Sequence, residues 1–537
     1  MNKIKLCLLT VLMSIAMTSC AVKTEVSEVS SDIHQEIENT ESTAQQAFDE
    51  EEITAGSSMP VISITTIDKT DDVLDFVTEP VAPHVSEQIA SWTPNYKMPP
   101  APYYELCNIT ITDSDKTVLL EDVEAQVKVR GNWTTTYAKK PLRIKFTEKQ
   151  SVLDLNGGAQ MRNWVLLAEY KDGSMLRDKT VLYIASELFE EEGLYSADAE
   201  FAEVFINGEY WGVYLLTEQQ QINSNRVNVT EAPKDYQGTD IGYFLEFDGY
   251  FTSEDALSGF AVDYAENAPL VPFDGNGGSG KTITCFSEKG KDTGFTIKSD
   301  IYSQAQHDFI ASYINNVYRI MYYGAYEDKA YVFNDDCTEI SETTELTPQE
   351  AIEKAVNVNS LADTYILNEL ACDADLYWSS FFMSADFGAQ GDKKLRFEAP
   401  WDFDSAMGNK DRCADGTGFY ASNILVDVND TYETVNPWLA VLMYEDWFCE
   451  IIKDRWTNAY DSGVFDRAYE MIENDTAQYE AELTRNYAKW DNLVNNKEFA
   501  SELTRKSARC KTHKEASDLL LEWLKTRVEF INEYWHE

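Results

Sequence analysis

Three aspartates in the stretch from Asn368 to Gly408 have the residue type and spacing that phosphoryl transfer requires. Asp375 follows an apolar segment, whereas Asp402 and Asp404 follow an expected strand, Leu395 to Phe397. Carboxylates grouped in this way can hold a divalent cation and orient a hydroxyl, and phosphoryl transfer depends mainly on positioning and charge stabilisation. The sequence therefore predicts a carboxylate-based site in this part of the chain.

A basic stretch without any acid, from Ala125 to Thr147, is the second feature that points to an anion. Apolar residues alternate with polar ones over 123–129 and with basic ones over 142–146, which is typical of two strands of a hairpin. The cations of this stretch are Lys128, Arg130, Lys139, Lys140, Arg143 and Lys145. We expect a hairpin that faces an anion, and the alternative is an ordinary solvated strand face.

The composition argues against several other functions. The chain has five histidines, of which only His307 lies well inside the folded body, so serine-histidine-acid catalysis and histidine-rich metal sites are disfavoured. Its 93 acids outnumber its 44 bases and give a formal charge of −49, which disfavours nucleic-acid binding. The nine widely spaced cysteines define neither a zinc motif nor a disulfide framework.

The N-terminus has the pattern of an export signal. Lys3 and Lys5 precede the apolar run Leu8 to Met17, and small residues then precede Cys20. This pattern predicts a lipoprotein signal over residues 1–20, with Cys20 lipidated and the protein held on the outer side of the membrane by that lipid alone. The alternative is an ordinary secretory signal, and either one predicts export. Residues 21–95 are rich in acids, Ser and Thr and are expected to form a disordered tether.

The remaining residues, 96–537, are expected to fold as a mixture of helices and strands. A buried strand is predicted over 163–170, with Asp172 or Ser174 capping a helix that runs to Phe189. The sequence from Glu203 to Glu218 predicts a hairpin that turns at Asn207-Gly208, and Gly242 to Asp248 predicts a further strand. Helices are predicted over 307–322, 347–370, 447–460, 464–487 and 516–535.

One segment, Gly275 to Thr282, matches the P-loop pattern G-x-x-x-x-G-K-[ST]. A working P-loop lies between a strand and a helix whose N-terminus helps to hold the phosphates. The residues that follow, Ile283 to Phe286, have the pattern of a strand, so a glycine-rich insertion is the preferred interpretation.

Five ordered motifs make residues 100 to 535 resemble the spore-coat protein H (CotH) kinases, which are atypical protein kinases. The matching residues are Arg130-Gly-Asn with Lys139-Lys-Pro-Leu-Arg-Ile-Lys145, Trp164 to Ala168 with Leu176-Arg177, Val204 to Gly208 with Gly212 to Glu218, Asn368-Glu-Leu with Asp375, and Pro400-Trp-Asp-Phe-Asp404 with Gly408. The resemblance implies an α+β, bilobal kinase-like fold, with a β-rich N-lobe at about 100–235, a C-lobe at about 240–430 and a helical tail at 435–537.

The resemblance also implies roles for individual residues. Asp375 would be the catalytic aspartate, Asp402 would bind magnesium and Asp404 would be a possible second ligand. Arg130, Lys140, Arg143 and Lys145 would be candidates to contact the phosphates of ATP, and spacing does not decide which one pairs with them. The implied cofactors are ATP and Mg²⁺, and the implied partner is a surface or secreted protein that accepts phosphate on Ser or Thr. One departure is Ser380, which stands where typical kinases have a metal-binding asparagine.

Two alternatives stay open from the sequence. ATP is scarce outside cells, which favours a catalytically inactive module on the same fold, serving cell-surface assembly or carbohydrate association. Glycoside hydrolysis by paired carboxylates is the other, and it requires two acids about 5 to 10 Å apart beside a sugar cleft.

Overall fold

The computed structural model describes residues 48–67, 74–275, 280–285, 293–410, 415–426 and 433–537. Residues 49–537 form one compact unit, and only Phe48 is described of the unit that precedes it. The unit contains both helices and sheets, so the predicted α+β class is confirmed. The predicted signal and its Cys20 lie outside the described residues.

Seven strands of the N-terminal half close into a β-barrel. They are β1 (Val61–Thr66), β2 (Glu105–Thr112), β3 (Val118–Val129), β4 (Leu142–Gln150), β5 (Met161–Leu167), β6 (Ala199–Ile206) and β7 (Glu209–Glu218). Neighbours in the order β1-β2-β3-β4-β5-β7-β6 are antiparallel, and a parallel pairing of β1 with β6 closes the barrel. Val127, Ile144 and Trp164 are buried inside it. Because successive strand residues point to opposite faces, Lys128 and Arg143 face outward.

The first strand of the barrel corrects the prediction of a tether over residues 21–95, which is wrong for 49–67 and 74–95. This region contains α1 (Glu50–Gly56), β1, α2 (Asp75–Thr78) and α3 (Pro83–Trp92). Ile62 and Ile64 on β1 are buried, and β1 pairs with both β2 and β6. The acidic composition of the region as a whole concealed the short run of alternating apolar residues that builds this strand.

We expect deletion of residues 1–95 to destabilise the fold strongly. The deletion removes β1 and with it the burial of Val61, Ile62 and Ile64. At about 1.5 to 3 kcal/mol for each large apolar side chain, the loss is a large fraction of the stability of an ordinary domain. Urea unfolding of fragments 49–537 and 96–537, followed by circular dichroism, should give a clearly lower midpoint for the shorter fragment. Equal midpoints would show that β1 is dispensable.

The predicted hairpins are confirmed, with one difference. β6 and β7 pair and turn at Asn207 and Gly208, which both have positive φ, as a tight turn requires. β3 and β4 form the predicted antiparallel pair. Their connection is longer than the tight turn expected at Gly131-Asn132, because the short helix η1 (Trp133–Thr136) lies within it.

The predicted helix after β5 begins slightly later than expected. Helix α5 (Arg177–Phe189) starts without a side-chain cap at Leu176. Asp172, one of the two predicted caps, instead accepts hydrogen bonds from the backbone N–H groups of Ser174 (2.9 Å) and Arg177 (3.0 Å). It therefore stabilises the loop and the first turn of the helix together.

A second sheet has five strands in the order β16-β15-β8-β12-β9. They are β8 (Gly242–Asp248), β9 (Gly259–Phe260), β12 (Gly294–Ile297), β15 (Phe381–Asp386) and β16 (Leu395–Phe397). β8 and β16 have the predicted bounds. Asp375 lies before the start of β15, and Asp402 lies after the end of β16. Because these two strands pair antiparallel, the segments that carry the two acids lie at the same end of the pair.

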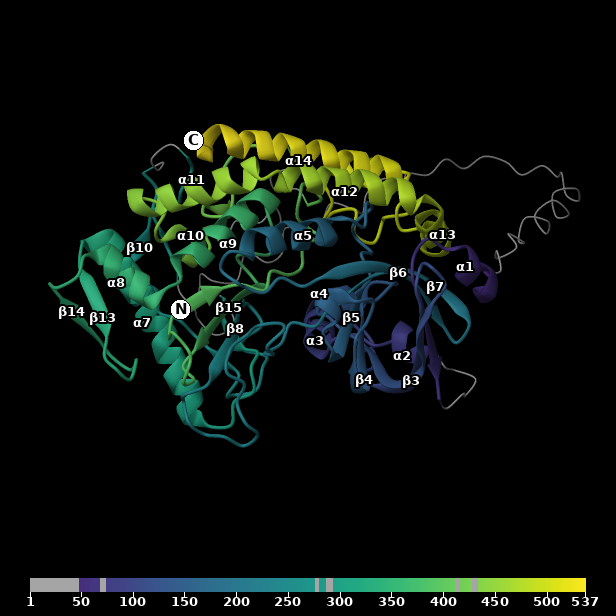
Figure 1. Ribbon diagram of the computed structural model, residues 1–537, viewed down its shortest axis with the longest axis horizontal. Helices are drawn as coiled ribbons and strands as arrows, with labels where there is room; N and C mark the ends of the chain where they lie inside the picture. Colours follow the sequence, from purple (N-terminus) through teal and green to yellow (C-terminus); the bar gives the residue numbers. More distant parts are fainter. Residues whose placement is uncertain (1–47, 68–73, 276–279, 286–292, 411–414, 427–432) are drawn as a thin grey trace, which may run out of the picture. The chain divides into compact units, whose positions relative to one another are not determined.

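The C-terminal helices form layers beside this sheet. Helix α14 (His513–Trp535) packs on α11 (Asp446–Asp461) and α12 (Val464–Gln478), and these helices pack in turn on α9 (Val358–Ala371) and α5 (Figure 1). Trp456 and Trp535 are buried between the layers. The helix α7 (Gln304–Glu327) packs on α8 (Pro348–Ala355).

Two of the predicted helices are divided in the structure. The one expected over 347–370 is α8 followed by α9, because Val356 is extended and Asn357 caps the second helix through its side chain. The one expected over 464–487 is α12 followed by α13 (Glu480–Trp490). The remaining elements are α4 (Leu155–Gly158), α6 (Tyr264–Asn267), β10 (Pro269–Leu270), β11 (Ile283–Thr284), β13 (Ala330–Phe333), β14 (Ile340–Thr343), β17 (Leu425–Val426), β18 (Glu433–Thr434), α10 (Pro437–Ala440) and η2 (Ser507–Arg509).

Strand β11 directly follows the P-loop-like segment, so the helix that a P-loop needs is missing there. In the described part of the chain, none of the helices is both long enough and apolar enough to cross a membrane.

Candidate active site

A cavity of about 600 Å³ lies where the ends of barrel strands β3, β5 and β7 approach the five-stranded sheet. Asp375, Asp402 and Asp404 all line it. The structure therefore brings together the three carboxylates that the sequence singled out. The other lining residues come from segments 130–141, 167–171, 219–220, 244–250, 378–382 and 501–502, together with Asp178, Lys298, Trp401 and Lys410.

Asp375 is held by the turn that follows helix α9. The helix ends at Ala371, and the capping residue Cys372 adopts the left-handed conformation (φ 49°). The backbone N–H of Asp375 then donates to the Asp373 carboxylate (3.0 Å), and the carbonyl of Asp375 accepts from the N–H of Trp378 (2.7 Å). These bonds fix the backbone on both sides of the Asp375 carboxylate, which faces the cavity.

Asp402 and Asp404 lie on the loop after β16. Asp402 has a positive φ of 74°, and its carboxylate accepts a hydrogen bond from the Ser380 hydroxyl (3.3 Å). The backbone N–H of Phe403, between the two acids, donates to Asp178 (2.7 Å). Ser380, the residue that departs from typical kinases, thus touches the predicted magnesium ligand.

The carboxylates in this cavity repel one another. Burial, together with the nearby charges of Asp404, Asp375 and Asp178, raises the pKa of Asp402 to about 8. Burial likewise raises the pKa of Asp373 well above its usual range, with Asp375 as the next cause. A bound cation would relieve this repulsion.

Two cations in the cavity are placed to meet an anion. The Arg130 guanidinium lies over the Trp401 ring, 5.3 Å from its centroid. The Lys171 ammonium lies 3.3 Å from Asp404 and 3.8 Å from Glu502. Although burial alone lowers the pKa of Lys171, Asp404 and the other nearby acids raise it well above its usual range, so this lysine stays charged. Sequence reasoning missed Lys171, which lies in the loop after β5.

The structure places Lys140, Arg143 and Lys145 outside the cavity, so only Arg130 of the four predicted phosphate contacts lines it. The Lys140 ammonium donates to the backbone carbonyls of Thr135 and Tyr137. Arg143 and Lys145 point outward from β4. Lys140 lies in the loop before β4 and bonds to the backbone of the preceding turn, whereas Arg143 and Lys145 are outward residues of that strand, so none of the three enters the cavity.

Lys139 does line the cavity, but its ammonium already donates hydrogen bonds to other groups of the protein. Its ammonium donates to the carbonyls of Ala168 and Val213 and to the side-chain oxygen of Asn486. Burial lowers the pKa of this lysine to about 7. Lys139 therefore joins the barrel to helix α13 and is a structural residue.

Glu169 and Asp178 form a buried acid pair that the sequence did not reveal. Glu169 is 4% exposed, has a positive φ of 47°, and neither carboxylate oxygen accepts a hydrogen bond from a donor in the described residues. The two acids lie within hydrogen-bonding range of each other, and burial raises the pKa of Glu169 well above its usual range and that of Asp178 to about 7. We therefore expect the pair to share a proton, which supplies the missing donor.

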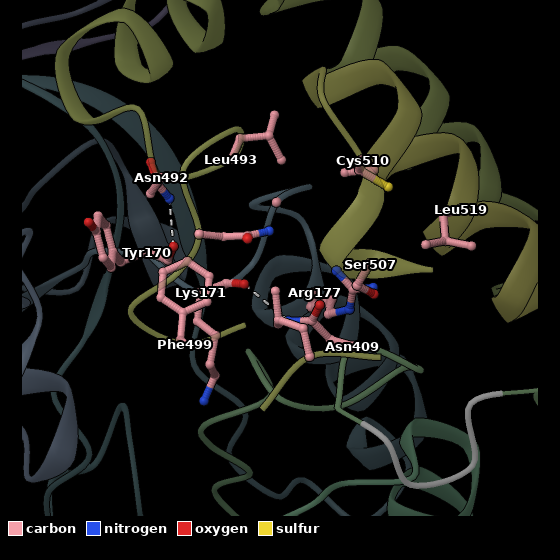
Figure 2. A pocket seen from close by; sticks show the side chains of 14 residues that line it. Tyr170, Lys171, Arg177, Asn409, Asn492, Leu493, Phe499, Ser507, Cys510 and Leu519 are labelled. Carbon is pink, nitrogen blue, oxygen red and sulfur yellow. Dashed lines mark hydrogen bonds between the residues drawn. The ribbon is translucent and has the colours of Figure 1, made fainter. Parts of the chain in front are cut away.

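The segment between α13 and α14 completes this side of the cavity. In a smaller pocket beside it, Asn492 donates to the carbonyl of Tyr170 (2.6 Å), and Asn409 donates to the carbonyl of Lys171 (3.3 Å) (Figure 2). The Thr504 N–H donates to the carbonyl of Asn409 (2.8 Å). Asn409 and the segment between α13 and α14, from two distant parts of the chain, thus fix the backbone that carries Lys171.

Apolar rings form another wall of the cavity. Phe244 and Phe382 stack with their centroids 5.4 Å apart, and Trp401 lies below Arg130. Gln219 and Gln220, at the end of β7, supply amide groups beside them. Flat apolar walls with a few polar groups suit a planar ring such as a nucleobase.

The donor set fits magnesium bound together with a nucleotide. Across the described ranges, no three Asp, Glu, His or Cys side chains are arranged to hold a metal by themselves. Mg²⁺ typically takes only one or two carboxylates and completes its shell with phosphate oxygens and water. Asp402 and Asp404 can supply that share, and the repulsion around Asp402 is the structural reason to expect a cation there.

The part of the chain that forms the cavity is similar to known proteins. A family model described as CotH kinase protein matches residues 127–531. Inner spore coat protein H from Bacillus subtilis (strain 168) is 34% identical over 96 residues, which cover 18% of this chain and 24% of that relative. The aligned stretch thus spans about a quarter of the relative's length, whereas the family model spans the barrel from the end of β3 onward, the cavity and most of the C-terminal helices. The chain belongs to the CotH kinase protein family.

Proposed function

We propose that this protein transfers the γ-phosphate of ATP, with Mg²⁺, to a Ser or Thr hydroxyl of a surface or secreted protein. The barrel and the helical part would act as the two lobes of a kinase-like fold. The observation that carries the proposal is the cavity that Asp375, Asp402 and Asp404 line together with two cations, Arg130 and Lys171. Membership of the CotH kinase family supports it.

The residues of the cavity would have different roles in the reaction. Asp375 accepts a hydrogen bond from the acceptor hydroxyl and takes its proton as the new bond to phosphorus forms and the bond to ADP breaks. Asp402 and Asp404 would hold Mg²⁺, which offsets negative charge on the phosphates. Arg130 and Lys171 would bind phosphate oxygens, because both present nitrogen donors to the cavity. Phe244, Phe382 and Trp401 would enclose the base.

Export and anchoring through Cys20 belong to the same proposal. The signal pattern of residues 1–20 supports them. The name of the Bacillus relative places that protein in a spore coat. An exported enzyme of this kind would act on proteins at the surface or beyond it.

Thermal unfolding with and without MgATP tests the proposal. A ligand at 100 times its dissociation constant stabilises the folded state by about 2.7 kcal/mol, so we expect an upward shift that requires both Mg²⁺ and ATP. If millimolar MgATP gave no shift, the nucleotide role would fail and a non-catalytic surface module would be the better account.

The variants Lys171→Met and Lys140→Met should separate the cavity lysine from the structural one. We expect Lys171→Met to weaken MgATP binding by about tenfold or more, which corresponds to ~1.4 kcal/mol, because it removes a charge beside Asp404. Lys140→Met removes two hydrogen bonds to the backbone, so it should lower stability without changing nucleotide affinity. Titration calorimetry on both variants measures the affinities. The reverse order would restore the assignment of Lys140 to the phosphates.

A further inference from the structure

A group of cations lies on the outer surface of the barrel. We define the β3–β4 basic face as Lys128, Arg130, Arg143 and Lys145. The inward residues of the same strands, such as Val129 and Ile144, are buried, so these alternate residues face outward. Lys128 and Arg143 are directly opposite each other in the strand pairing, and Gln126 is opposite Lys145. The face therefore holds like charges side by side.

These charges lack carboxylate partners. None of Lys128, Arg143 and Lys145 is within ion-pair distance of an acid in the described parts of the chain. Arg143 donates to the side-chain oxygen of Asn163 (2.9 Å), and its buried Nε has no hydrogen-bond partner. The ammonium groups of Lys128 and Lys145 lie 4.8 and 6.0 Å from the centroid of the Tyr104 ring.

Such an arrangement is unexpected in a chain with a formal charge of −49. Like charges directly opposite each other on neighbouring strands are destabilising. Burial lowers the pKa of Lys128, and the charges of Arg143, Arg130 and Lys145 lower it further. Each of these observations indicates that the charges of this face destabilise the fold when no anion is bound. A bound anion would offset that destabilisation.

The basic face leads into the cavity. Arg130 lies two residues beyond Lys128, just past the end of β3 at Val129, and it lines the cavity that holds Asp375 and Asp402. At 3.3 Å per residue, the row from position 126 to position 130 is roughly 13 Å long. That distance matches about four residues of an extended peptide. The length suits a short anionic segment, whereas the acidic body would repel a long polyanion such as a nucleic acid.

We propose that the β3–β4 basic face binds an anionic segment of the acceptor polypeptide, next to the Ser or Thr that enters the cavity. The anions would be Asp or Glu carboxylates or phosphates already attached to neighbouring residues. This inference rests on the proposed function, and it names the class of acceptor: a chain in which the target hydroxyl is flanked by acids or phosphoserines. Phosphates already added would then favour transfer to a nearby hydroxyl.

Fluorescence anisotropy with three labelled peptides tests this directly. The peptides share one sequence and carry four Glu, four phosphoserines or four Gln residues beside a single target Ser. We expect the Glu and phosphoserine peptides to bind, with affinity falling at high salt, and the Gln peptide to bind at least about tenfold more weakly. The stronger of the two anionic peptides identifies the preferred anion. Equal binding of all three would overturn the proposal, as would stronger competition by a single-stranded oligonucleotide than by either anionic peptide.

Two triple variants with the same loss of charge provide the control. Lys128→Gln, Arg143→Gln and Lys145→Gln together should weaken binding of the anionic peptides by at least about tenfold. Lys453→Gln, Lys514→Gln and Lys525→Gln, whose lysines pair with acids on the C-terminal helices, should change it less than about twofold. Equal effects of the two triple variants would show that peptide binding depends on the net charge of the protein and not on this face, and would overturn the proposal.

MgATP-induced stabilisation separates this inference from the proposed function. It should be the same in the basic-face variant and the unmodified protein, because Lys128, Arg143 and Lys145 lie outside the cavity. If MgATP stabilised neither protein while the difference in peptide binding persisted, the kinase proposal would fail and the anion-binding face would stand. If MgATP stabilised both but no anionic peptide bound, only the acceptor proposal would fail.

Discussion

Replacing Asp375 with asparagine is expected to lower the rate of phosphate transfer by roughly 100- to 10,000-fold, the usual contribution of a general base. The amide keeps the size of the side chain but cannot take the proton of the acceptor hydroxyl. The hydrogen bonds that hold this residue use its backbone, so the fold and the binding of MgATP should be unchanged. The rate is measured as acceptor-dependent release of ADP.

The neighbouring variant Asp373→Asn is the matched control. Asp373 is buried and accepts the backbone N–H of Asp375, a bond that an asparagine oxygen can also accept. We therefore expect most of the transfer rate to survive in this variant. If Asp375→Asn kept the full rate while Asp373→Asn lost it, the catalytic assignment would have to move.

Replacing Asp402 with asparagine is expected to have two opposite effects. Without metal, the variant should be more stable than the unmodified protein near pH 8, by roughly 1 to 3 kcal/mol, because the amide removes one charge from a group of mutually repelling carboxylates. With MgATP, it should lose the stabilisation that the unmodified protein shows, because Asp402 is a proposed metal ligand. Chemical unfolding at several pH values, with and without MgATP, measures both effects.

The pH dependence of the metal-free protein follows from the direction of the shifts. The pKa of Asp178 is raised to about 7 and that of Asp402 to about 8, so the folded state holds protons that the unfolded state has already released. Their contribution to stability is fully present below the unfolded pKa, near 4, and is lost as the pH rises through about 7 to 8. A stability contribution from these acids that increased over this range would contradict the described cluster. Asp402→Asn should flatten the decline.

The elements with strong local patterns were predictable from the sequence. The turn at Asn207-Gly208 forms as expected, because its residues accept positive φ and the flanking strands alternate. Strand β16, which precedes Asp402 and Asp404, likewise has the predicted bounds. In each case the information lies within a few neighbouring residues.

Features that depend on distant contacts were not predictable. Strand β1 lies in an acidic region and is recognisable only because β2 and β6 pair with it. Lys171 became a site residue only when Asp404 and Glu502 were brought to it from far along the chain. The Glu169–Asp178 pair depends on a left-handed backbone at Glu169 that its sequence does not signal.

The most direct test of the account is to follow the phosphate itself. ATP carrying heavy oxygen in its γ-phosphate would be incubated with fragment 49–537, Mg²⁺ and a surface-protein extract, and mass spectrometry would then locate the heavy label. The account predicts heavy phosphate on Ser or Thr residues, with the label absent for Asp375→Asn and for reactions without Mg²⁺. Transfer of a nucleotidyl group, or label that is equally abundant with Asp375→Asn, would contradict it.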